Sequence, residues 1–296
     1  MLPELSEIPL KVIAGPTASG KSALALEMAE KCNGEIVSID SMQLYRLIPI
    51  GTAQPDADDL AKVPHHLVGI YEFEQRAEVY TFVEMAEKVI REIAGRGRAP
   101  VLCGGTGLYL KSLLYGLDQL PGDDDLKKSL DLEYDDPAQL AALQARLNAL
   151  GDAAVVEKFT NNRRRLIRAL EIRLLTGRSI FELQGEYKMQ LRFKLSEAFH
   201  LVHDRSVLQE RIAKRTALML KNGWIEEAEN AIKHGLLTSP TAHQALGYKI
   251  INRYLQGEID FNELEKLIVT ATWQYARRQQ TWFRHQHPEL AVKVMS

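Results

Sequence analysis

The chain has 296 residues, of which 46% are hydrophobic and 26% are charged, an ordinary balance for a globular protein with a full core. Its 37 basic and 39 acidic residues give a net charge of −2, so any nucleic-acid partner must be held by local basic patches. Cys32 and Cys103 lack metal-site spacing. No signal-peptide pattern and no apolar run long enough to span a membrane is present, so we expect a cytoplasmic protein.

A glycine-rich segment near the start predicts a phosphate-binding loop. Residues 10–14 are a short, mostly apolar run, the sequence GPTASGKS follows at residues 15–22, and a stretch rich in Ala, Leu and Glu comes next. Strand, glycine-rich turn and helix N-terminus together form a P-loop, whose backbone N–H groups and helix dipole bind phosphate. Lys21 would contact the terminal phosphate and Ser22 would bind Mg²⁺. The motif does not distinguish a nucleoside triphosphate from an isolated diphosphate.

An aspartate follows the second expected strand. Residues 35–39 (EIVSI) are apolar enough for a strand, and Asp40 comes directly after them. Ligands of open parallel sheets bind at the carboxyl ends of the strands, so Asp40 is expected beside the P-loop, where it could contact Mg²⁺ or take a proton. A turn or N-cap role fits the sequence equally well. Further on, His65 and His66 have no third metal ligand near them in sequence, which favours structural hydrogen bonds.

The next expected strand, residues 100–103, leads into Gly104, Gly105 and Thr106. Many P-loop kinases and ATPases place an aspartate here to hold Mg²⁺, and this chain has none. The Gly-Gly-Thr turn either forms a second anion-binding nest with a hydroxyl contact to substrate or is only a tight strand-to-helix turn.

The alternation of strands and helices stops near residue 117. Helical spacing predicts a helix over residues 140–150, and residues 161–173 (NNRRRLIRALEIR) place five arginines on a further helix. Such a run is either a solvated surface helix or a set of contacts to a phosphate backbone.

The last third of the chain has a strand over residues 199–203, then a helix with Arg211 and Arg215 one turn apart, and helices over 224–237 and 261–278. The arginine pair could clamp a diphosphate or lie on the surface. The tail, residues 272–287, interleaves aromatic and cationic residues. This is typical of RNA binding, although a helix that packs its aromatics into the core would look the same.

Taken together, these segments resemble the tRNA dimethylallyltransferase (isopentenyltransferase) family. They occur in the family's order over nearly the whole chain. The matching segments are GPTASGKS at residues 15–22, DSMQLY at 40–45, GTAQP at 51–55, PHHL at 64–67, GGTGLY at 104–109, RLIRALE at 165–171, GYK at 247–249 and RQQTWFR at 278–284.

The resemblance implies an α/β fold, in which a P-loop parallel sheet is flanked by helices and carries an all-helical insertion. Residues 1–116 and 197–296 would form the core, and residues 117–196 would form an insertion domain that contacts tRNA. A monomer is expected.

The resemblance also implies the reaction. A dimethylallyl group would pass from dimethylallyl diphosphate to N6 of the adenosine 3′-adjacent to the anticodon, in tRNAs that read codons beginning with U. Asp40 would hold and deprotonate the amine, Thr106 would contact the adenosine, and Arg215 would stabilise the leaving diphosphate. Ser22 would bind Mg²⁺. The diphosphate would be bound by Gly15, Thr17, Ala18, Ser19, Gly20, Lys21, Ser22 and Arg211.

A flipped nucleotide would enter the site, and basic segments would hold the anticodon stem-loop. The residues implied to contact tRNA are Asp40, Ser41, Met42, Gln43, Thr106, Lys128, Arg164, Arg165, Arg168, Gln244, Gly247, Tyr248, Lys249, Arg277, Arg278, Gln279, Trp282 and Arg284. Two alternatives stay open. One is a prenyltransferase acting on free adenine nucleotides, and the other is a P-loop kinase of a small metabolite.

Overall fold

The computed structural model describes residues 3–116, 120–186 and 190–295, except for the side chains of residues 185 and 186. The chain divides into two compact units, one formed by Met1–Gly116 with Leu191–Ser296 and the other by Leu117–Gln190. Residues 191–196, which the sequence analysis assigned to the insertion, therefore lie in the first unit. The reason is strand β5, which begins at Lys194 rather than near residue 199.

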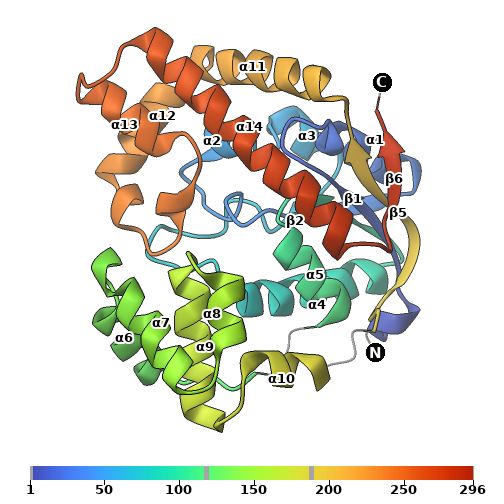
Figure 1. Cartoon of the computed structure of the whole chain (residues 1–296). Helices are drawn as coiled ribbons and strands as arrows, with labels where there is room; N and C mark the ends of the chain where they lie inside the picture. Colours follow the sequence, from blue (N-terminus) through green and yellow to red (C-terminus); the bar gives the residue numbers. More distant parts are fainter. Residues whose placement is uncertain (1–2, 117–119, 187–189, 296) are drawn as a thin grey trace. The chain divides into compact units, whose positions relative to one another are not determined.

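The first unit is built on a six-stranded sheet in the order β3-β2-β4-β1-β5-β6, with all neighbouring strands parallel (Figure 1). The strands are β1 (Pro9–Ala14), β2 (Gly34–Ile39), β3 (His65–His66), β4 (Ala99–Gly104), β5 (Lys194–Val202) and β6 (Ala291–Val294). The sequence analysis did not predict β6, a four-residue edge strand whose Val292 and Val294 are exposed.

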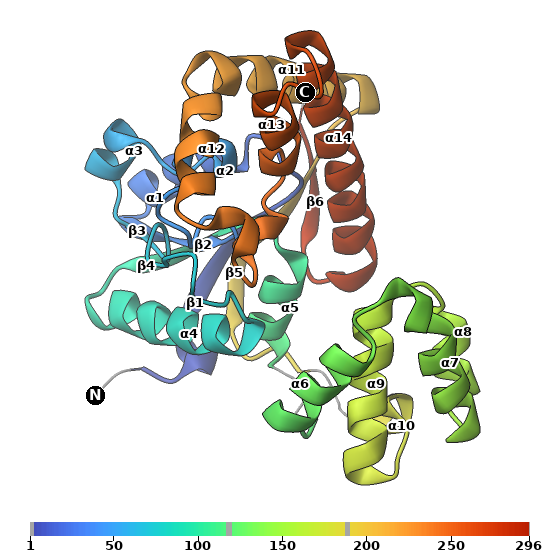
Figure 2. The same cartoon turned by 90° about the vertical axis from the view of Figure 1, so that its left-hand side faces the viewer.

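Helices of the first unit connect and cover these strands, and α11 and α14 lie side by side (Figure 2). They are α1 (Lys21–Lys31), α2 (Pro49–Thr52), α3 (Ala57–Lys62), α4 (Val79–Gly95), α5 (Gly107–Tyr115), α11 (Arg205–Lys221), α12 (Trp224–Lys233), α13 (Tyr248–Leu255) and α14 (Phe261–Gln286). Short 3-10 turns lie at Leu5–Glu7, Leu236–Thr238 and Ala242–Gln244.

Packing of α1 on the sheet fixes the P-loop between them. Ala25 and Ala29 of α1 are fully buried against Ile13, Ile36 and Val101 of the central strands. These small alanines let the helix approach the β-branched side chains closely, which anchors both ends of the P-loop in the core.

The second unit is helical in its described residues and has a core of its own. Its helices are α6 (Asp124–Glu133), α7 (Leu140–Ala149), α8 (Ala153–Phe159), α9 (Arg163–Thr176) and α10 (Ile180–Glu186), with a 3-10 turn at Pro137–Gln139. Leu143 and Leu147 of α7 pack with Leu166 and Leu170 of α9 at the i, i+4 spacing of an apolar helix face. Among the described residues, no helix is both long and apolar enough to cross a membrane.

Candidate active site

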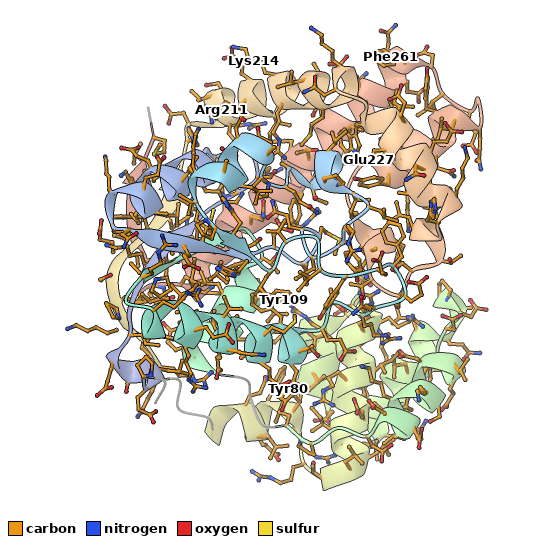
Figure 3. All side chains as sticks on the ribbon, turned by 180° about the vertical axis from the view of Figure 1, so that it is seen from behind. Tyr80, Tyr109, Arg211, Lys214, Glu227 and Phe261 are labelled. Atoms are coloured by element: carbon orange, nitrogen blue, oxygen red, sulfur yellow. The ribbon has the colours of Figure 1, made fainter. Side chains whose placement is uncertain are left out.

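The P-loop joins β1 to α1 and is held by side chains from other elements. Gly20 begins the helix with φ at +86°, a left-handed conformation that favours glycine. Three carbonyl oxygens of the loop each have a side-chain nitrogen partner: Lys21 Nζ at 3.2 Å from Pro16, Arg211 Nε at 2.8 Å from Ala18 and His203 Nε2 at 2.8 Å from Ser19. Arg211 projects from α11 (Figure 3). These contacts fix the conformation of the loop, a glycine-rich turn of the kind whose backbone N–H groups bind anions.

Asp40 lies directly after β2 and is half-buried beside Lys21 and Arg215. Its Oδ1 accepts a hydrogen bond from Met42 N at 2.9 Å, which fixes the carboxyl group. Burial raises the pKa of Asp40, while the positive charge of Lys21 opposes the rise. Burial likewise lowers the pKa of Lys21. A carboxylate in this setting is a better base than an exposed one.

Thr106 ties the end of β4 to the end of β2. Its hydroxyl accepts from Ser41 N at 3.2 Å, and its own N–H donates to Ile39 O at 3.1 Å. The Gly-Gly-Thr turn therefore sits beside Asp40, at the same edge of the sheet.

Gln279 of α14 connects the two glycine-rich turns. It is buried, its Oε1 accepts from Thr17 N at 2.9 Å, and its Nε2 donates to Gly105 O at 2.9 Å. Arg215 donates to the Thr17 hydroxyl. Both ends of the Gln279 amide are thus used inside the protein, rather than facing a partner as the sequence analysis expected.

Lys21, Asp40, Arg215 and Gln279 line one cavity of about 400 Å³ in the first unit, and Thr106 contacts its lining residue Ser41. Cationic and acidic groups from the P-loop, β2 and α11 meet apolar side chains in it. The lining residues are Thr17, Lys21, Ser22, Asp40, Ser41, Met42, Gln43, Gly51, Thr52, Ala53, Arg215, Thr216, Met219, Trp224, Gln244, Leu246, Thr272, Tyr275, Arg278 and Gln279. Such a cavity fits a substrate with an anionic end, an apolar part and an amine to be deprotonated.

Comparison with known proteins identifies the family. The IPP transferase family matches residues 43–286, and the isopentenyl transferase family matches residues 8–68. The chain belongs to the IPP transferase family.

Among the relatives of this family member, a tRNA dimethylallyltransferase of Geobacter sulfurreducens is 40% identical over 94% of this chain and 90% of the relative. One from Acetivibrio thermocellus is 38% identical over 92% of this chain and 88% of the relative.

Two solved structures have a similar fold. One is the tRNA isopentenylpyrophosphate transferase of Bacillus halodurans, with a TM-score of 0.70 and 34% identity, covering 97% of this chain and 90% of that one. The other is a eukaryotic dimethylallyltransferase acting on tRNA, with a TM-score of 0.79 and 27% identity, covering 98% of this chain and 74% of that one.

In this IPP transferase family member, the candidate residues of α14 include an exposed group, which holds all three arginines, and buried Gln279. Arg277, Arg278 and Arg284 are exposed, and half-buried Trp282 packs against Gly107. Arg277, Arg278 and Trp282 line a groove of about 680 Å³. The opposite face carries Ala276, Gln279 and Phe283 into the core. Core packing is therefore confirmed for one face of the helix, and RNA binding by the exposed face stays a prediction.

The candidates around α13 divide in the same way. Gln244 and Lys249 are exposed. Gly247 and Tyr248 are buried, and the Tyr248 hydroxyl donates to Glu227 at 2.6 Å. Tyr248 is thus part of the protein interior and not of an exposed surface.

In the helical unit, Lys128, Arg164 and Arg165 are exposed. Arg168 instead pairs with buried Glu171 at 2.7 Å and donates to Leu120 O at 3.2 Å, which joins the segment before α6 to α9. Asn162 caps α9 by accepting from Arg165 N at 3.2 Å.

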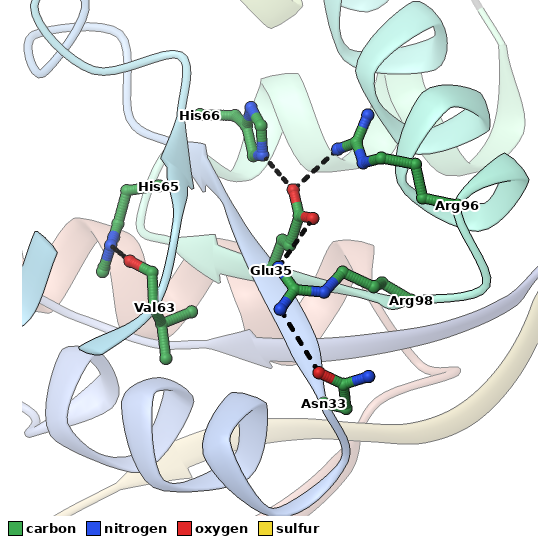
Figure 4. Close-up of polar contacts among 7 residues, drawn as sticks. All are labelled: Asn33, Glu35, Val63, His65, His66, Arg96 and Arg98. Carbon is green, nitrogen blue, oxygen red and sulfur yellow. Dashed lines mark hydrogen bonds and ion pairs between the residues drawn. The ribbon is translucent and has the colours of Figure 1, made fainter. Parts of the chain in front are cut away.

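The histidine pair makes structural hydrogen bonds, as expected (Figure 4). His65 Nδ1 lies 2.8 Å from Val63 O, and His66 Nε2 lies 2.6 Å from Glu35. Glu35 is buried at the start of β2 and also pairs with Arg96 and Arg98.

The sequence analysis missed several lining residues. Met219, Trp224, Thr272 and Tyr275 lie on helices whose apolar spacing looks like that of any core helix, so only the structure brings them to the cavity. Glu227 was missed because one acidic residue in an amphipathic helix gives no signal by itself.

Proposed function

We propose that this protein transfers a dimethylallyl group from dimethylallyl diphosphate to N6 of the adenosine 3′-adjacent to the anticodon, in tRNAs that read codons beginning with U. The observation that carries the proposal is the cavity in which the P-loop, half-buried Asp40 and apolar side chains meet. The names of the relatives and structural neighbours support the tRNA substrate and the prenyl group.

The reaction is a displacement at an allylic carbon. The N6 lone pair attacks C1 of the donor, the C1–O bond breaks, diphosphate leaves, and the amine loses one proton. We assign that proton to Asp40, whose raised pKa suits a base. Lys21 and Arg215 would stabilise the negative charge that develops on the diphosphate. Thr106, which already fixes Ser41, would orient the adenosine.

The donor would lie with its diphosphate on residues 15–22 and beside Arg211. Mg²⁺ fits this site through the Ser22 hydroxyl, which is exposed and lines the cavity next to Lys21. Mg²⁺ commonly takes one or two protein ligands together with phosphate oxygens and water. When bound, it would neutralise part of the diphosphate charge.

Exposed polar and cationic side chains are proposed to hold the anticodon stem-loop. They are Gln244 and Lys249 near α13, the arginines of the α14 groove, and Lys128, Arg164 and Arg165 of the helical unit, whose Arg168 would act by holding α9. We also propose that the protein acts as a monomer.

Incubation with labelled dimethylallyl diphosphate and either bulk tRNA or AMP tests the proposal. We expect label in tRNA, recovered as N6-(dimethylallyl)adenosine after digestion, and none in AMP. Label in AMP alone would favour the free-nucleotide prenyltransferase. ATP hydrolysis driven by a small metabolite would favour the kinase. Either result would overturn the proposal.

A further inference from the structure

Glu227 of α12 is an acidic side chain outside the reacting groups whose carboxylate has three hydrogen-bond partners. It points toward α2 (Figure 3), where Oε2 accepts from Ile50 N at 2.6 Å and Oε1 accepts from Gly51 N at 2.9 Å. Oε1 also accepts from the Tyr248 hydroxyl at 2.6 Å. A carboxylate can satisfy all three donors at once, whereas a neutral amide of the same shape cannot.

Residues 51–53, which we call the 51–53 wall, form the part of the cavity lining that Glu227 holds. Gln43 holds the same wall from the other side, with Nε2 donating to Thr52 O at 3.1 Å and to Ala53 O at 2.8 Å. Glu227 therefore holds the N–H groups of Ile50 and Gly51, and Gln43 holds the carbonyl groups of Thr52 and Ala53.

Packing leaves the wall no room to move toward α12. A Cβ atom built on Gly51 would lie 2.2 Å from Trp224 Nε1 and 2.3 Å from the Tyr248 hydroxyl oxygen. Trp224 and Tyr248 are themselves almost fully buried. Glycine is thus required at position 51 for the backbone to reach Glu227.

The chemistry of the wall suits the hydrocarbon part of a donor. Ala53 borders a small hollow that Ser22 also lines, so the Ala53 end of the wall lies beside the phosphate end of the site. Met219 and Trp224 line the same cavity as the wall and add apolar surface. A chain attached to a diphosphate on the P-loop would extend along this surface.

We propose that Glu227 is a positioning residue, which holds the 51–53 wall and thereby limits the length of the prenyl chain that the cavity accepts. The proposal rests on the proposed function. It assigns chain-length selection to a side chain that touches neither the donor nor the adenosine and that acts through the backbone of α2.

The test compares the native protein with Glu227→Gln, Tyr248→Phe and the control Glu226→Gln, which makes the same change at an exposed position of the same helix. For each, KM is measured for dimethylallyl diphosphate and Ki for geranyl diphosphate, which is one isoprene unit longer. In Glu227→Gln one backbone N–H loses its acceptor, so the wall should yield and geranyl diphosphate should bind better relative to dimethylallyl diphosphate. We therefore expect the ratio of KM to Ki to rise by about tenfold. Tyr248→Phe should shift it less, in the same direction, and Glu226→Gln not at all.

KM for tRNA should stay unchanged in all variants. An unchanged donor ratio in folded Glu227→Gln, or an effect confined to the KM for tRNA, would overturn the proposal. If Glu227→Gln does not fold, Tyr248→Phe decides alone, because it removes one hydroxyl and keeps the ring. Failure of the proposed function would look different, since the native protein itself would then not transfer label to tRNA.

Discussion

At the scale of single residues, the site depends on how burial acts on opposite charges. Asp40, Lys21 and Arg215 are enclosed together, so each loses hydration and each stabilises its neighbours of opposite sign. Bound diphosphate would pair with the two cations and leave Asp40 as the group able to take a proton. Binding of the donor would therefore change the charge balance around Asp40.

Asp40→Asn tests the role of that carboxylate. The amide keeps an oxygen for Met42 N–H but cannot accept a proton from the amine, so kcat should fall by about a hundredfold or more. Binding of tRNA, measured by filter retention, should change little. Loss of tRNA binding, with transfer per bound tRNA preserved, would contradict the assignment.

Burial of Asp40 also predicts the pH dependence. Its pKa is raised above the ordinary 3.8, and a base must be ionised, so kcat/KM should fall as the pH drops through this raised value. Between the ordinary pKa and the raised pKa, the folded state holds a proton on Asp40 that the unfolded state has released. Asp40 therefore contributes to stability at low pH, and this contribution is lost as the pH rises through the raised pKa. An acid limb at the ordinary aspartate value, in a profile of kcat/KM against pH, would argue against Asp40 as the base.

At the scale of elements, α14 has different surroundings on its two faces. Its inner face carries Gln279, which joins the P-loop to the Gly-Gly-Thr turn, and its outer face carries the arginine groove. If the outer face binds RNA as proposed, the same helix would contact RNA and hold the P-loop.

Replacing Arg277 by alanine tests the outer face. If Arg277 contacts a tRNA phosphate, the slope of log Kd against log salt should decrease by roughly one, with kcat unchanged at saturating tRNA. Lys266→Ala removes an exposed cation from the other half of α14 and is the matched control. Equal slopes for Arg277→Ala and the native protein would show that Arg277 does not contact a tRNA phosphate.

The cluster around Glu35 is an element-scale stabiliser, since it joins β2, β3 and the turn after α4 (Figure 4). Burial raises the pKa of Glu35, but hydrogen bonds from Arg96, His66 and Arg98 lower it to about 2. Its contribution is present above the ordinary glutamate value and is lost as the pH falls toward 2.

Glu35→Gln should therefore lower the free energy of unfolding by about 1–3 kcal/mol at neutral pH, because two guanidinium groups lose a charged partner. Transfer kinetics should not change, since Glu35 and Asp40 lie at opposite ends of β2. Urea unfolding followed by circular dichroism measures the loss, and exposed Glu30→Gln is the control. Equal unfolding midpoints for the two variants would count against a stabilising role.

The sequence predicted the elements whose signal is local. The P-loop and the Gly-Gly-Thr turn were placed because glycines follow short apolar runs, and the strand before Asp40 because residues 35–39 are themselves such a run. The roles of Tyr248, Gln279 and Glu227 could not be predicted in this way. Each is decided by a partner far along the chain, as when Gln279 meets Thr17. The sequence pattern of an amphipathic helix does not show which of its polar residues will be buried.

At the scale of the whole molecule, the helical unit is inserted between Leu114 and Arg192, two residues that are in contact within the sheet unit. Arg192 N donates to Leu114 O at 2.8 Å, and Arg192 also pairs with Glu87 at 2.6 Å. The end of α5 and the segment before β5 are thus joined by contacts within the sheet unit. Its core is formed by its own leucines.

Replacing residues 117–190 with a short Gly-Ser linker should therefore leave the sheet unit folded. The variant should retain inorganic pyrophosphate binding, measured by calorimetry, because the P-loop, Arg211 and Arg215 all lie outside the insertion. If Lys128, Arg164 and Arg165 bind tRNA, its affinity should fall by about tenfold or more, since several phosphate contacts are lost at once. A triple Lys128→Ala, Arg164→Ala and Arg165→Ala variant of the full chain keeps the insertion and removes only its three cations, so it shows whether their charge accounts for the lost tRNA affinity. Native tRNA affinity in both variants would show that the insertion has no part in RNA recognition, and loss of pyrophosphate binding in the linker variant would show that the sheet unit depends on it.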